Sequence, residues 1–130
     1  MSSDDRRLVL GRGFELAMET VLAAFLGEGF TVTPLDAGDL HHRDQPGRSL
    51  RFATLQVTLP ELCFRGLPAD TPTVLACRVS LFELTQSCTL VTAENPLTRY
   101  PLLASMVPRL ADRVARALRI VIDAGVLTAA

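Results

Sequence analysis

Tryptophan and lysine are absent from the 130-residue sequence, which also has only two histidines and three cysteines. Cys63, Cys77 and Cys88 are an odd number of thiols without C-x-x-C spacing, which argues against a disulfide framework and against a structural zinc site. Free thiols are typical of a reducing compartment, so we expect a cytoplasmic protein.

The sequence also lacks long apolar runs and an excess of one charge. The longest apolar runs, such as residues 21–26, are far shorter than the ~20 residues that span a bilayer. The polar residues 1–7 do not resemble the start of a secretory signal. Thirteen arginines against fourteen acidic residues give a net charge of −1, so no global field attracts nucleic acid or an anionic membrane. We therefore predict neither as a partner.

Motifs of the common catalytic and nucleotide-binding classes are missing as well. The chain has no G-x-S-x-G, Walker, G-x-G-x-x-G or H-E-x-x-H pattern, so it identifies no catalytic constellation and no cofactor. A non-enzymatic protein is favoured, although the sequence does not decide the question. What is present is the composition of a folded domain, with 48% apolar and 21% charged residues. We expect one domain over residues 1–130.

Hydrophobic periodicity predicts most of the helices and strands. Phe14, Ala17, Val21 and Phe25 fall on one face of a helix that ends at Gly27. Apolar residues repeat again at steps of three and four from Leu103 to Val121, which predicts a second long helix. Period-two alternation and turn residues predict strands over residues 6–10, 30–35, 50–59, 73–84 and 88–94, with loops over residues 36–48 and 68–72.

A short helix is expected after the third strand. Thr58-Leu59-Pro60-Glu61 has the S/T-x-x-E spacing of a capping box, and proline is tolerated in a first helical turn. This pattern predicts a helix over residues 59–66. The resulting order is β-α-β-β-(short α)-β-β-α, which favours an α+β fold with an antiparallel sheet and helices packed on one face.

Several segments together resemble the bacterial domain-of-unknown-function family 302. They are Phe14-Glu-Leu-Ala with Gly29-Phe30, Thr58-Leu-Pro-Glu-Leu-Cys-Phe-Arg-Gly-Leu, Val74-Leu-Ala-Cys-Arg-Val, Leu81-Phe-Glu and Val91-Thr-Ala-Glu-Asn-Pro. The similarity extends over residues 8–122. It implies a fold like one half of the TATA-box-binding protein, β-α-β₄-α, which is often dimeric and has no established reaction.

The sequence departs from this family where a reactive group would be expected. Thr58 stands in place of the family's first cysteine, whereas Cys77 keeps the second. A cysteine at a helix N-terminus would favour the thiolate, and threonine retains only the hydrogen-bonding cap. The resemblance and the capping box together suggest a ligand pocket formed by Thr58, Pro60, Glu61 and Cys77.

Our leading hypothesis is a homodimeric binding module for a small molecule or a protein partner. The high apolar content and the heptad-like seam of the last helix suggest more apolar surface than one small core consumes. The alternative is a thiol- or metal-dependent redox or sensor protein that uses Cys77 with Cys63 or Cys88. A third reading is a structural subunit without a ligand.

Three further candidates have alternative interpretations: a single cysteine, a pair of histidines and a row of arginines. Cys77 alternates with apolar neighbours, which favours a buried and unreactive thiol. His41 and His42 are weak candidates for a metal site, but no third histidine exists, and a solvated loop is favoured. The spacing of Arg109, Arg113 and Arg116 predicts a basic stripe on one helix, either solvated or in contact with an anion.

Overall fold

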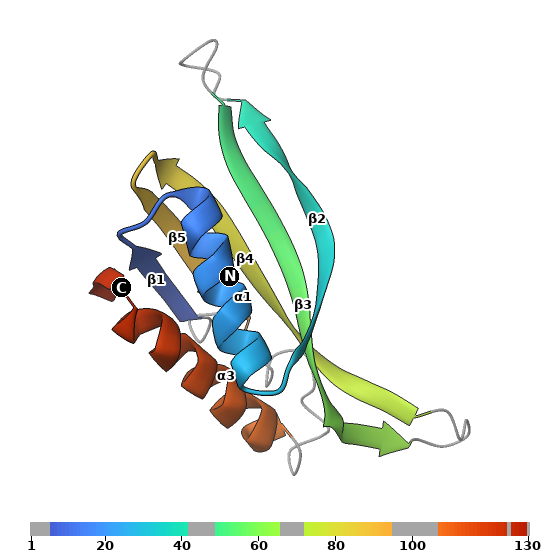
Figure 1. Cartoon of the computed structure of the whole chain (residues 1–130). Coiled ribbons are helices and arrows are strands. Elements are labelled where there is room, and N and C mark those ends of the chain that lie inside the picture. Colours follow the sequence, from blue (N-terminus) through green and yellow to red (C-terminus); the bar gives the residue numbers. More distant parts are fainter. Residues whose placement is uncertain (1–5, 42–48, 66–71, 95–106, 125, 130) are drawn as a thin grey trace.

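A twisted antiparallel sheet, covered on one face by two helices, makes up the structure (Figure 1). This computed structural model describes residues 6–41, 49–65, 72–94, 107–124 and 126–129. The elements in chain order are β1 (Arg6–Leu10), α1 (Phe14–Gly27), β2 (Thr31–His41), β3 (Ser49–Arg65), β4 (Pro72–Thr85), β5 (Cys88–Ala93), α3 (Val107–Asp123) and β6 (Val126–Ala129). The spatial order of the strands is β2-β3-β4-β5-β1-β6, and all neighbours are antiparallel. The predicted α+β class is confirmed.

Alternation along the strands separates a core face, covered by α1 and α3, from an open face that neither helix covers. Successive side chains of a strand point to opposite faces of the sheet. The core-facing residues of the four central strands are buried, as the period-two pattern predicts. They include Ala53, Leu55 and Val57 of β3, Val79 and Leu81 of β4, Val91 and Ala93 of β5, and Leu8 and Leu10 of β1.

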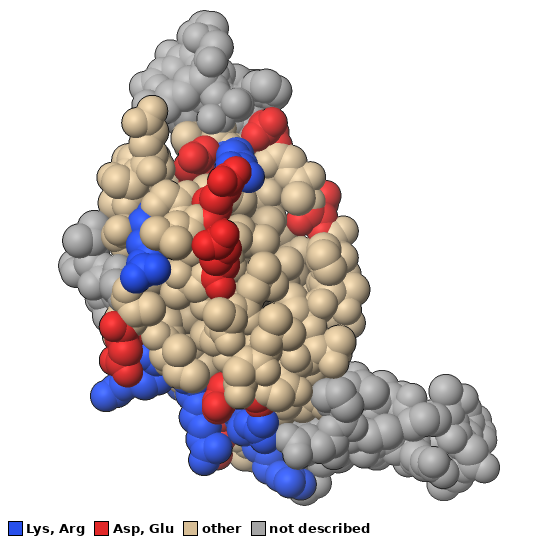
Figure 2. Space-filling view, in the orientation of Figure 1, with Lys and Arg blue, Asp and Glu red and all other residues tan. Residues whose placement is uncertain are grey.

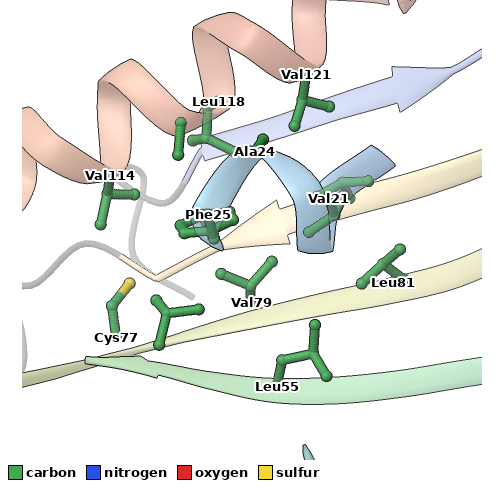
Figure 3. Close-up of a cluster of buried hydrophobic side chains, with 14 of the residues drawn as sticks. Val21, Ala24, Phe25, Leu55, Cys77, Val79, Leu81, Val114, Leu118 and Val121 are labelled. Atoms are coloured by element: carbon green, nitrogen blue, oxygen red, sulfur yellow. The ribbon is translucent and has the colours of Figure 1, made fainter. Parts of the chain in front are cut away.

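The two helices bury the apolar faces that their sequences predict. In α1 the side chains of Val21, Ala24 and Phe25 lie between α3 and the sheet (Figure 3). The buried residues of α3 repeat at steps of three and four, and they are Leu110, Val114, Ala117, Leu118 and Val121. The helical periodicity in the sequence therefore corresponds to a single packed layer over the sheet.

Two arginines connect α1 and α3 at both ends of the pair. Arg12, just before α1, donates hydrogen bonds to the carbonyl oxygen of Ala124 and to Oγ1 of Thr20, the latter at 3.2 Å. Arg113 of α3 donates to the carbonyl oxygen of Glu28, which follows α1. Each guanidinium thus lies at the C-terminal end of the other helix, where the helix dipole favours a positive charge. The helices are consequently fixed in an antiparallel arrangement.

The structure extends the sheet beyond the predicted strands. Residues 36–41, expected as part of a loop, continue β2, where they pair with the first half of β3 as far as His41 and Ser49. The pairing shifts between Pro34 and Asp36, so the proline sits at an irregularity of an edge strand, where its missing N–H costs little. The short strand β6 was not expected; it pairs with β1 at the other edge.

The short helix predicted over residues 59–66 is wrong. Residues up to Arg65 belong to β3, and Thr58 pairs with Ala76 of β4 instead of capping a helix. Between Thr58 and Cys63 the register with β4 shifts, and β2 ends its pairing at Thr58. Pro60 therefore lies in an irregular stretch of β3 that has no partner on the β2 side. A strand tolerates proline at such an irregularity. The backbone pairing of β3 with β4 therefore prevails over the capping-box pattern, which had predicted a helix.

A turn through Gly29 leads from α1 into β2, and a substitution at this glycine tests the backbone conformation of the turn. Gly29 has φ of +89°, and a Cβ there would lie 3.1 Å from Nη2 of Arg113. We expect Gly29→Ala to lower the free energy of unfolding by about 1–2 kcal/mol, because L-residues disfavour positive φ. Urea unfolding followed by circular dichroism measures the change.

Gly27→Ala is the matched control for this turn. Gly27 is the last residue of α1, and a Cβ there would meet nothing within 4 Å. Alanine is the better helix former, so this variant is expected to unfold at the same or a slightly higher urea concentration. Equal losses in both variants would contradict the strained turn.

Candidate functional site

The structure does not assemble the pocket expected around Thr58 and Cys77. In the register of β3 and β4, Thr58 pairs with Ala76, whereas Cys77 pairs with Val57. Thr58 therefore faces the open side, where its Oγ1 lies 3.5 Å from the carbonyl oxygen of Thr31. Cys77 faces the core and is fully buried. The two side chains belong to opposite faces of the sheet, so they do not line one pocket.

The other two residues of that expected pocket, Pro60 and Glu61, lie in the irregular part of β3. Their backbone is extended, so no helix N-terminus is present to hold an anion or to activate a thiol. The resemblance-based location of the site is therefore not supported by the local geometry. The physical reason is that β4 supplies backbone partners on both sides of the shift.

Cys77 has the surroundings of a structural thiol. Its Sγ donates to the carbonyl oxygen of Glu94 at 3.0 Å and lies 3.8 Å from that of Arg78. Cys88 begins β5, six residues before Glu94, and by the alternation of the strand its side chain is on the open face. At about 3.3 Å per residue, the two sulfurs are separated by roughly 20 Å. Cys77 and Cys88 therefore do not form a thiol pair. Cys63 pairs through its backbone with Val74.

The weak candidates for a metal site are not brought together, and two carboxylates of the sheet, Glu83 and Glu94, also lie apart. His41 ends β2, and His42 lies outside the described residues. Among the residues that the structure describes, no three His, Cys, Asp or Glu side chains are grouped closely enough to hold a metal ion. Glu83 accepts a hydrogen bond from the backbone N–H of Arg51 at 3.0 Å and lies far along β4 from the end where Glu94 is found.

An apolar row crosses the open face. The cross-strand pairs join Val9 to Leu90, Leu90 to Phe82 and Phe82 to Phe52, so four large apolar side chains from four strands stand side by side. All four are partly exposed. Gly38 of β2 continues the row, and a Cβ there would approach the Phe52 ring to 3.1 Å. We call these five residues the open-face row.

A second row beside it is polar at its centre and charged at its ends. Thr92, Ser80 and Thr54 are paired across β5, β4 and β3, and the hydroxyl oxygens of Thr54 and Ser80 are 3.3 Å apart. The row ends in Arg7 on β1 and Asp36 on β2. The sequence contains a signal for the apolar open-face row that the helix and strand prediction did not use. Phe52, Phe82 and Leu90 occupy strand positions that, by alternation with the core residues, would be polar on a solvated face.

The predicted basic stripe on the last helix divides into different environments. Arg113 is held by the carbonyl oxygen of Glu28, and Arg109 is exposed at the start of α3. Arg116, together with Arg119, borders a cleft of about 320 Å³ that also includes Arg6 of β1. Figure 2 shows arginine side chains gathered along the margin where Figure 1 places α3. Sequence spacing could not associate Arg6 with Arg116 and Arg119, since the cleft is lined by residues from opposite ends of the chain.

No protein-family model matches the chain, and no curated protein matches it either. The resemblance to family 302 therefore stays a prediction based on the quoted residues. Of the two helices in the described part of the chain, neither α1 nor α3 is long and apolar enough to cross a membrane.

The reactivity of Cys77 provides a test of its burial. We expect a variant with Cys63→Ser and Cys88→Ser to resist a disulfide-exchange reagent in the folded state, because its remaining thiol has no solvent contact. The labelling rate should then follow the unfolding rate as urea is added. Folded-state labelling as fast as that of a small free thiol would contradict the burial of Cys77. It would favour the alternative of a thiol-dependent redox or sensor protein.

Proposed function

We propose that the protein is a homodimeric binding module and that the open face of its sheet is the dimer interface. The observation that carries the proposal is the open-face row, whose large apolar side chains point away from both helices. A contiguous partly exposed apolar surface of this kind marks an interaction site more often than isolated surface residues do. The proposal assigns binding rather than catalysis.

The row is self-complementary about its centre, and this favours a second copy of the chain as the occupant. A two-fold axis parallel to β4, in the plane between two stacked sheets, would place Phe82 against its own counterpart. The same operation brings Leu90 of one protomer over Phe52 of its partner, because these residues lie on either side of Phe82. It also brings the Arg7 end of one protomer over the Asp36 end of the other.

The open face supplies part of the area that a dimer needs. Five strands spaced about 4.8 Å apart, with about five residues of each contributing, present roughly 400 Å² as a flat surface, not counting the area added by protruding side chains. Stable interfaces bury about 800 Å² of accessible surface per partner. The longer strands β2, β3 and β4 extend the face beyond the flat area counted here. The elements from β1 to α3 follow the β-α-β₄-α order that the resemblance to family 302 implies, and β6 is added after them. This order supports the resemblance to a family that is often dimeric.

Sedimentation velocity of the wild-type chain and of Phe82→Glu tests the proposal. The substitution would place two carboxylates against each other at the centre of the interface, without a partner for either charge. We expect the wild type to sediment as a dimer and the variant as a monomer, with association weakened by about 2 kcal/mol or more. Leu16→Glu is the control, because Leu16 is 48% exposed on α1 and does not belong to the open face.

A charge exchange makes the test specific for the proposed geometry. Arg7→Glu alone should weaken the dimer, and Arg7→Glu combined with Asp36→Arg should restore it, because the exchanged charges would again face each other. Circular dichroism checks that each variant is folded. A monomeric wild type, or a dimer that survives Phe82→Glu but not Leu16→Glu, would contradict the interface.

A further inference from the structure

The cleft beside α3 combines three positive charges with an apolar lining. Arg6 comes from the first residue of β1, and Arg116 and Arg119 come from α3. All three are exposed, and the rest of the lining is formed by Ala115, Leu118 and Ile122. The cleft lies on the side of the helices, so it is separate from the open face.

The charge in this cleft is not balanced by the described residues of its lining. None of the described residues that border the cleft is acidic. Within the described part of the chain, the Arg6, Arg116 and Arg119 side chains have no hydrogen bond or ion pair, in contrast to Arg12, Arg51 and Arg113. Neighbouring guanidinium groups repel one another, and a bound anion would relieve that repulsion while accepting charge-assisted hydrogen bonds.

The apolar lining distinguishes the cleft from a simple basic surface. Ala115, Leu118 and Ile122 repeat at steps of three and four, so they form one continuous strip along α3. Leu118 is buried, whereas Ile122 is 37% exposed, which leaves apolar surface available inside the cleft. A volume of about 320 Å³ is near the lower limit for small-molecule pockets, so a compact ligand would fill it.

We propose that this cleft binds a small organic anion, with a carboxylate or phosphate held by Arg6, Arg116 and Arg119 and a short aliphatic chain on the apolar strip. Planar guanidinium groups match both head groups, because each presents two oxygens in a fork geometry. Nucleic acid is disfavoured by the net charge of −1. The site is independent of the dimer interface, since it uses the other side of the molecule.

Calorimetric titration of the full chain with octanoate and with octyl phosphate tests this assignment and separates the two head groups. Octanol and inorganic phosphate are the matched probes that each lack one half of the ligand. We expect at least one amphiphilic anion to bind, with octanol and inorganic phosphate each at least about tenfold weaker, since loss of either half removes interactions worth more than 1.4 kcal/mol. Binding of inorganic phosphate equal to that of octyl phosphate would overturn the role of the apolar strip.

Variants of the arginines show whether binding occurs in this cleft. Arg116→Gln and Arg119→Gln should each weaken binding about three- to tenfold, as expected for partly solvated charge-assisted contacts. Arg109→Gln is the control, because it removes the same charge from the same helix without bordering the cleft. Equal weakening by all three variants would indicate only a general charge effect and would overturn the site.

A last variant separates an external ligand from the chain's own acidic residues. Asp4 and Asp5 directly precede Arg6 in the sequence. The proposal is supported if the wild type and the double variant Asp4→Asn/Asp5→Asn bind the anion with equal affinity. Binding that appears only after these substitutions would overturn it, because the cleft would then serve the chain's own carboxylates. Each of these outcomes is independent of the oligomeric state measured by sedimentation.

Discussion

Burial of only one face of the sheet is the constraint on which the rest of the structure depends. Since α1 and α3 cover the same side, every second residue of each strand enters the core and every other one stays outside. This separation places Cys77 with Val57 in the interior while Thr58 faces outward. It also leaves Phe52 and Phe82 on a surface that no described helix covers.

The helix layer is held in register by packing and by two reciprocal arginine contacts. Phe25 is fully buried against the sheet, and its ring meets that of Phe30 edge-on with centroids 5.1 Å apart. Arg12 and Arg113 each bind a carbonyl oxygen at the end of the other helix. With α3 fixed in this way, one side of this helix and Arg6 of β1 line the cleft that contains Arg116 and Arg119. The two proposed binding surfaces consequently lie on different sides of the molecule.

The failure of the capping-box prediction shows how a ladder overrides a local signal. A capping box contributes two hydrogen bonds, whereas residues before and after the irregular stretch of β3 pair with β4 over most of its length. The T-x-x-E pattern at Thr58 is therefore compatible with a strand that contains an irregularity at Pro60. Backbone pairing with β3 likewise extends β2 through residues 36–41, where the glycine and aspartate content had predicted a loop.

The sequence by itself determined the features that depend on near neighbours along the chain. The apolar spacing of α1 and α3 and the alternation in β3, β4 and β5 were sufficient for the α+β class and for most of the core, because each period repeats within a few residues. Tertiary structure alone decided the strand register, the pairing of β6 with β1 and the placement of Arg6, Arg116 and Arg119 around one cleft. These features depend on contacts between segments distant in the chain, and such contacts are set by how the faces pack together rather than by any local pattern.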